Sequence, residues 1–363
     1  MIAARIVVFA AGAFVVYATV GSAVRTVILP RGVPAKLGRF VFVTLRSVFR
    51  LWAGPSATYE RRDRVMALYA PVGLLALLAT WVTLVMVGYI AMFWGVGHRS
   101  LRTSFYLSGS SLLTLGFERP PDIPSAALTF TEAGLGLVLL ALLITYLPSI
   151  YGAFSRRELA VTDLEVRAGS PPSGVEMIER YWILGRVDRL DEVWRRWEEW
   201  FEEVEESHTS FPAVVFFRSP QPDHSWVTAA GAVLDGASLV TSTVDVPRNV
   251  QAEFCIRAGY LALRRIAGFF GVPYDASPKR GDPVTIGRDE FDAVCERLAT
   301  AGVPLKLDRD EAWLDFIGWR VNYDQVIVAL AGLTMAPYAP WSSDRSLRTW
   351  RPRLFQRRTP ARR

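Results

Sequence analysis

Ser110-Ser111-Leu112-Leu113-Thr114-Leu115-Gly116-Phe117-Glu118 lies between two long apolar segments, residues 65–94 and residues 129–151. Each segment is long enough to cross a bilayer, which takes about 20 apolar residues in a helix. The interval between them is too polar to cross, and irregular backbone at membrane depth is stable only inside protein or along a water-filled path. The pattern therefore predicts a short helix over residues 101–113 that re-enters the membrane and is followed by extended chain.

A third apolar segment, residues 6–24, lies near the N-terminus. A signal peptide is the alternative, because Arg5 precedes the segment and Val20-Gly21-Ser22-Ala23 offers small residues for cleavage. The segment is long for a signal peptide, and an arginine-rich loop follows it. We therefore expect a retained N-terminal transmembrane helix over residues 1–24.

The loop that follows, residues 25–64, carries nine Lys or Arg residues against two acidic residues. The positive-inside rule places such a loop in the cytoplasm, which puts the N-terminus outside and the C-terminal half in the cytoplasm. Residues 40–52 mix large apolar side chains with a helix face formed by Arg39, Arg46 and Arg50. This pattern is typical of an interfacial helix whose basic face contacts anionic lipid. A buried helical hairpin with the first span is the alternative.

The two later spans, the predicted re-entrant helix and the motif Thr114-Leu115-Gly116-Phe117 together resemble the pore module of the potassium-channel superfamily, over residues 65–157. The resemblance implies a homotetramer in which four copies of the motif meet on one axis. It also implies that the backbone carbonyls of Thr114, Leu115, Gly116 and Phe117 replace the water shell of a permeant monovalent cation, K+. No other metal and no cofactor is implied.

The sequence departs from the family where the pattern would continue Gly-Tyr-Gly-Asp, because Phe117, Glu118 and Arg119 follow Gly116. Glu118 stands where the family's glycine adopts a left-handed backbone, which costs another residue about 1–2 kcal/mol. Glu118 and Arg119 would form rings of opposite charge at the pore mouth and change ion entry. Cation permeation is thus predicted more firmly than K+ selectivity. The alternative is a non-conducting, membrane-anchored signalling or scaffold protein with a degenerate pore loop.

Three residues of the last span are candidates for a gating hinge. Gly134 and Gly136 would bend the helix, and Pro148 would splay its inner end. For each glycine, close helix packing alone is the alternative. Glu132 either supports the filter from behind or lies at the wet interface. No span carries arginine at every third position, so no voltage sensor is predicted.

The second half of the chain, residues 175–340, has the composition of a soluble domain and is predicted to be mainly helical, with tryptophans in its core. Residues 211–217 are predicted as a strand or as buried extended chain. Asp223 or Ser225 is expected to cap the helix that follows. The helical pattern covers residues 177–206, 224–241, 249–270, 289–301 and 308–333.

Motifs of enzymes and nucleotide-binding domains are missing from the sequence, which has no G-x-G-x-x-G after a strand, no P-loop and no H-E-x-x-H. Cys255 and Cys295 form no C-x-x-C pair, which is compatible with a reducing compartment. The arginine-rich tail, residues 341–363, is expected to contact anionic lipid of the inner leaflet rather than nucleic acid.

Together these patterns predict a mainly α-helical, multi-pass protein of the cell membrane, with three spans, one re-entrant pore helix and a helical cytoplasmic domain. The predicted function is a tetrameric cation channel, and no enzymatic activity is expected. The expected parts are the N-terminal helix (1–24), the basic loop (25–64), the pore module (65–157, with the filter at 114–118), the helical domain (175–340) and the basic tail (341–363).

Overall fold

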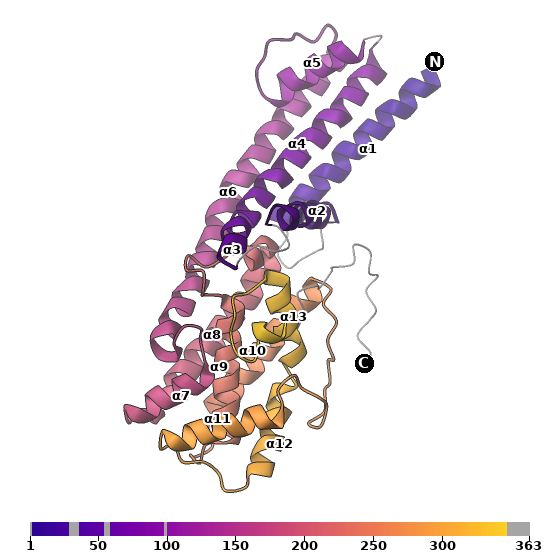
Figure 1. The fold of residues 1–363 in the computed structure, drawn as a ribbon. Helices are drawn as coiled ribbons and strands as arrows, with labels where there is room; N and C mark the ends of the chain where they lie inside the picture. The colour runs from indigo at the N-terminus through magenta and orange to yellow at the C-terminus, as the bar shows by residue number, and fades with distance from the viewer. Residues whose placement is uncertain (1, 29–35, 54–58, 98–99, 347–363) are drawn as a thin grey trace. The chain divides into compact units, whose positions relative to one another are not determined.

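The computed structural model describes residues 2–28, 36–53, 59–97 and 100–346 (Figure 1). Of the described residues, 76% are helical and none lies in a β-strand, so the mainly α-helical fold is confirmed. The chain forms two compact units. We call Met1–Pro55 with Leu68–Gly152 the membrane unit, and Ser56–Ala67 with Ala153–Arg363 the C-terminal unit.

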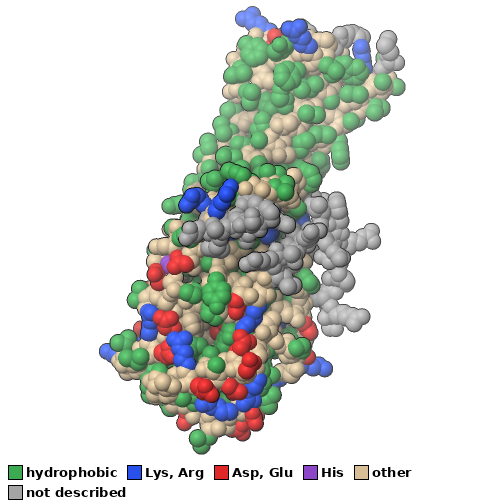
Figure 2. Space-filling view, in the orientation of Figure 1, with side chains coloured by type: hydrophobic (Ala, Val, Ile, Leu, Met, Phe, Trp, Pro, Cys, Tyr) green, Lys and Arg blue, Asp and Glu red, His purple; other side chains and the backbone are tan. Residues whose placement is uncertain are grey.

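Three helices have the length and composition needed to cross a membrane, as predicted. They are α1 (Ile2–Val27), the segment Asp63–Val96, which contains α4 (Tyr69–Val96), and α6 (Ile123–Ala168). Figure 2 shows hydrophobic side chains spread over the membrane unit, whereas Lys, Arg, Asp and Glu side chains gather on the C-terminal unit. This division of side-chain chemistry identifies a membrane protein.

A short break lies within the segment Asp63–Val96, where α3 (Tyr59–Ala67) ends and α4 begins only at Tyr69. Pro71 explains the break, since it has no N–H to donate to the Ala67 carbonyl and its ring clashes with that carbonyl. The helix predicted to run from residue 65 is therefore interrupted at Leu68.

Small residues allow α1 to lie directly against α4. A Cβ added to Gly12 would come within 2.4 Å of the Gly88 carbonyl oxygen, and one added to Gly95 would lie 2.9 Å from the Arg5 carbonyl oxygen. Backbones approach this closely only where both helices lack side chains at the contact. The first span therefore packs within the membrane unit, and its retention rather than cleavage stays a prediction.

The amphipathic helix predicted at residues 40–52 is α2 (Lys36–Ala53), and one side of it packs on α4. The Tyr69 hydroxyl donates to the Phe42 carbonyl at 2.8 Å, and the Phe49 ring meets the Tyr69 ring edge-on. Arg46 is only 8% exposed, so the predicted basic face does not turn wholly toward lipid. The side chain of Arg50 lies outside the described residues.

The C-terminal unit is a helical bundle around α9 (Trp226–Ser242), which is buried along almost its whole length. Tryptophans of α8 fill the core beside it, as the aromatic pattern predicted. The Ser225 side chain, one of the two predicted caps, accepts from the Val227 N–H. The other helices are α7 (Gly174–Ile183), α8 (Leu190–Ser210), α10 (Val250–Phe269), α11 (Arg288–Thr300), α12 (Arg309–Arg320) and α13 (Asp324–Thr334).

Three local predictions for this unit were wrong. Residues 211–217 form a 3₁₀-helix, Pro212–Phe216, rather than a strand or extended chain. The pattern over 177–206 is divided between α7 and α8 because Gly185, at φ +62°, turns the chain. The pattern over 308–333 is divided after Arg320, where the Asn322 side chain donates to the Gly318 carbonyl in place of a backbone N–H.

Candidate functional site

The predicted re-entrant helix is present as α5 (Leu101–Leu112) in the membrane unit. The Ser100 side chain caps its start by accepting from the Thr103 N–H at 3.2 Å. Its buried face is lined with small hydroxyl residues at helical spacing, Ser104, Ser108 and Ser111. That α5 enters the membrane as a pore helix stays a prediction.

The chain after α5 folds back so that its N–H groups return to the helix end. The N–H groups of Leu115 and Gly116 both donate to the Ser110 carbonyl, at 2.8 Å and 3.2 Å, and the Glu118 N–H donates to the Ser110 hydroxyl at 3.1 Å. A trans peptide places its N–H and its C=O on opposite sides. The carbonyls of Thr114, Leu115 and Phe117 therefore point away from α5.

Backbone strain lies at Thr114 rather than at Glu118. Thr114 has φ +55° and Gly116 has φ +69°, whereas Glu118 has no left-handed backbone. The expected cost of about 1–2 kcal/mol thus moves from Glu118 to a β-branched residue, where such a backbone is a genuine outlier. Glu118 thus does not adopt the left-handed backbone of the family's glycine, and the strained residue is the first of the proposed filter.

The filter side chains are uncovered in the single chain. Leu115 is 61% exposed and Phe117 is 60% exposed. The Phe117 ring meets the Tyr106 ring of α5 edge-on, with centroids 6.4 Å apart. Glu118 is half-buried, Arg119 is exposed, and neither forms an ion pair within the described ranges.

Glu132 of α6 lies directly behind α5 and not at a wet interface. Its side chain is fully buried, at 0% exposure. The Ser108 hydroxyl donates to one carboxylate oxygen at 2.5 Å and the Ser111 hydroxyl to the other at 3.1 Å. Of the two alternatives for this residue, the wet interface was wrong, and support of the filter stays a prediction.

The three hinge candidates differ in their surroundings. Gly136 lies against the end of α5, where an added Cβ would come within 2.2 Å of the Leu112 carbonyl oxygen. An added Cβ at Gly134 would meet nothing within 4 Å. Pro148 lies inside α6, which continues to Ala168. Close packing therefore explains Gly136, and a hinge at Gly134 or Pro148 stays a prediction.

Replacing Gly136 with alanine is expected to destabilise the membrane unit by about 1–3 kcal/mol, because α5 must move to relieve the clash. Replacing Gly134 with alanine is the matched control, two positions away on the same helix, and should be neutral or slightly stabilising. Thermal unfolding of both variants in detergent measures the difference. Equal midpoints for the two variants would contradict the close contact.

In the C-terminal unit, the part of α6 that follows the apolar segment carries a buried arginine. Arg157 is 2% exposed and donates to the backbone carbonyls of Val214 and Phe217 at 2.8 Å and 2.7 Å. It also pairs with Glu158 at 2.6 Å and lies 3.3 Å from Nε2 of His208. Arg157 thus fastens α6 to the segment that follows α8.

His208 is fully buried between this guanidinium, the Ser207 hydroxyl and the Trp226 ring. Burial and the charge of Arg157 hold the pKa of His208 well below its ordinary value. The unfolded chain binds a proton near pH 6.5, where the folded chain does not. Stability is therefore expected to fall as the pH drops below about 6.5, by at most about 1.4 kcal/mol per pH unit.

Urea unfolding at pH 7.5, 6.5 and 5.5 measures this dependence. His208→Gln keeps a polar side chain without a titrating ring, so the part of the slope that belongs to His208 should disappear in that variant. Identical pH slopes for the wild-type chain and the variant would contradict the assignment.

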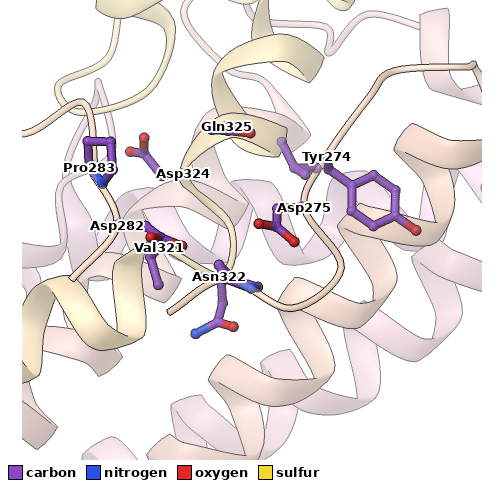
Figure 3. A pocket seen from close by; sticks show the side chains of 10 residues that line it. Tyr274, Asp275, Asp282, Pro283, Val321, Asn322, Asp324 and Gln325 are labelled. Atoms are coloured by element: carbon purple, nitrogen blue, oxygen red, sulfur yellow. The ribbon is translucent and has the colours of Figure 1, made fainter. Parts of the chain in front are cut away.

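Two cavities lie in the C-terminal unit, of about 230 Å³ and about 300 Å³. Figure 3 shows the first, where Asp275 and Asp282 of the loop after α10 lie near Asp324 at the start of α13. The Asp324 carboxylate is already held by Arg320 and by Thr285. The described residues contain no group of His, Cys, Asp or Glu side chains suited to hold a metal ion.

The chain matches no protein-family model, no curated protein and no solved structure. Its function must therefore be argued from the sequence pattern and the geometry. The sequence analysis missed the accepting role of Ser110 and the buried state of Arg157. The serine spacing on α5, together with a single acid in an apolar helix, was the available signal for the contact with Glu132.

Proposed function

We propose that this protein is a tetrameric cation channel, potassium-like, in which the backbone carbonyls of Thr114, Leu115, Gly116 and Phe117 line the ion path. One observation carries the proposal. The N–H groups of Leu115, Gly116 and Glu118 donate to Ser110, so the carbonyls of Thr114, Leu115 and Phe117 point away from α5. Among the described residues, none donates to the carbonyls of these four. Such groups need water, an ion or another polar partner.

The tetramer supplies what the single chain lacks. Leu115 and Phe117 are apolar and uncovered, and large exposed apolar side chains mark interaction surfaces when they gather. Four copies around one axis would cover these side chains and point the carbonyls at a shared path. Carbonyl oxygens in such a ring replace the water shell of a cation.

The proposed orientation has the N-terminus outside and the C-terminal unit in the cytoplasm of a cell-membrane protein, because the loop 25–64 is rich in arginine. This loop and the tail 341–363 would contact anionic lipid. Residues 347–363 of the tail lie outside the described residues. No nucleic acid and no cofactor takes part in the proposed function.

The C-terminal unit would gate or assemble the pore through α6. This helix runs without interruption from its apolar part to Ala168. Arg157, on the same helix, holds the backbone of Val214 and Phe217. A rearrangement of the bundle would therefore reach the inner helix through one continuous element.

The experiment is cation flux from liposomes that contain the purified tetramer. A K+ gradient should discharge at a rate that rises with the amount of protein, and empty liposomes should not discharge. Parallel Na+ gradients measure the K+/Na+ selectivity. This quantity is not set by the family resemblance, because Glu118 and Arg119 replace the family's residues at the pore mouth. A folded tetramer that passes no cation would favour the alternative, a non-conducting signalling or scaffold protein.

A further inference from the structure

A single acidic side chain interrupts the apolar part of α6. Glu132 is the only acidic residue between Ile123 and Ser155. An ionisable group at membrane depth is costly and is kept where it has a function and a polar partner. Glu132 has such partners, because the side chain is fully buried and accepts from two hydroxyl groups of α5.

The contact between α6 and α5 includes two points that lie one helical turn apart on α6, beside a longer contact from the Ser111 hydroxyl to the Thr129 carbonyl at 3.4 Å. Gly136 touches the Leu112 carbonyl, and Glu132 accepts from Ser108 and Ser111. Residues four apart share a helix face, so both points belong to one surface. At this surface, Gly136 sets the distance between α6 and the C-terminal turn of α5. Glu132 sets the rotation of that turn about the axis of α5.

The same turn of α5 determines the backbone of the filter segment. Ser111 donates through its hydroxyl to Glu132 and accepts through its carbonyl from the Thr114 N–H at 3.0 Å. Two hydrogen bonds therefore join the carboxylate to the first filter residue. The neighbouring Ser110 accepts from Leu115, Gly116 and Glu118. A rotation of this turn would move every one of these acceptors.

We propose that Glu132 is the positioning residue of the filter, which holds the end of α5 through Ser108 and Ser111 and so sets the direction of the filter carbonyls. This inference rests on the proposed function. Glu132 touches no permeating ion in this role. Its removal leaves Ser108 and Ser111 only their longer contacts, at 3.3 Å to the Met86 carbonyl and 3.4 Å to the Thr129 carbonyl, and so weakens the hold on the end of α5. Ion discrimination depends on where the filter carbonyls lie.

The test compares K+ and Na+ flux through reconstituted tetramers of the wild-type chain, Glu132→Ala and Glu132→Gln. The K+/Na+ flux ratio should fall at least tenfold in Glu132→Ala. It should stay within about threefold of the wild-type ratio in Glu132→Gln, whose amide oxygen still accepts from one serine. Thr131→Ala removes the hydroxyl of the adjacent residue and should leave the ratio unchanged.

A double-mutant comparison identifies the route. Replacing both Ser108 and Ser111 with alanine should lower the ratio in the wild-type background and have little further effect in Glu132→Ala, because the two changes remove one connection. Fully additive effects would overturn the route through the serines. If Glu132→Ala does not assemble, Ser111→Ala is the test variant, and its K+/Na+ flux ratio is expected to fall about threefold.

The outcomes separate this inference from the function on which it rests. A wild-type tetramer that passes no cation overturns both. A conducting wild-type tetramer whose flux ratio is unaltered by Glu132→Ala, or by Ser111→Ala where that variant stands alone, overturns only the role of Glu132. If Glu132→Ala lowers thermal stability but leaves the K+/Na+ flux ratio unchanged, Glu132 contributes to packing and does not position the filter.

Discussion

Replacing Arg157 with methionine is expected to lower the stability of the C-terminal unit by about 3–5 kcal/mol. The substitution keeps an apolar stem of similar length but removes every donor of the guanidinium. The buried carbonyls of Val214 and Phe217 then lose their partner, and Glu158 becomes an uncompensated buried charge. Stability should fall because unpaired polar groups remain inside, not because volume is lost.

Arg156 offers a control at the adjacent position. Its side chain is exposed, so Arg156→Met should change stability by less than about 0.5 kcal/mol. Unfolding of the full chain in detergent can be followed by tryptophan fluorescence, because nine of the twelve tryptophans belong to residues 153–363. Equal stabilities for the two methionine variants would show that Arg157 does not hold the bundle as its contacts indicate.

Arg157→Lys adds a sharper comparison. Lysine keeps the charge beside Glu158 but cannot reach two carbonyls and a carboxylate with the planar fork of a guanidinium. We expect this variant to recover only part of the lost stability. Recovery of the full wild-type value would mean that charge alone, rather than the three-way hydrogen bonding, explains the burial of Arg157.

Replacing Gly116 with alanine is expected to reduce cation flux at least tenfold while the chain still folds. Gly116 has φ +69°, so alanine there is strained by about 1–2 kcal/mol. An added Cβ would meet nothing within 4 Å in the single chain, so no steric clash prevents the variant from folding. The strain is relieved if the peptide units around residue 116 rotate, and that rotation turns carbonyls away from the proposed ion path.

Gly21 of α1 provides the matched substitution. Its added Cβ would lie 3.6 Å from the flexible Arg25 side chain, which is ordinary contact, and the residue lies within a regular helix. Gly21→Ala should conduct like the wild-type chain. Wild-type flux through assembled Gly116→Ala tetramers would exclude residues 114–117 as the filter.

The sequence was sufficient where short-range patterns determine the structure. α5 ends one residue before its predicted boundary, and Ser225 caps α9, because apolar spacing and capping chemistry are local. The same reasoning failed at residues 308–333, where an apolar pattern continues but the side chain of Asn322 takes over a carbonyl of α12. The helical spacing of apolar residues does not indicate that a side chain will replace a backbone N–H as the donor to a helix carbonyl.

Long-range contacts account for what the sequence could not predict in the candidate site. Arg157 lies 57 residues from Val214, and nothing near either residue signals that one would donate to the other. The strain at Thr114 was not predicted, because the family pattern draws attention to the position of its second glycine, Glu118 in this chain. The structure instead has the left-handed residues at positions 114 and 116, where the chain turns back on Ser110.

The length of α6 bears on how much of it a membrane can hold. A helix of 46 residues is about 69 Å long, more than twice the roughly 30 Å thickness of a bilayer's hydrocarbon core. Such a core takes about 20 helical residues, so more than half of α6 would extend beyond the hydrocarbon.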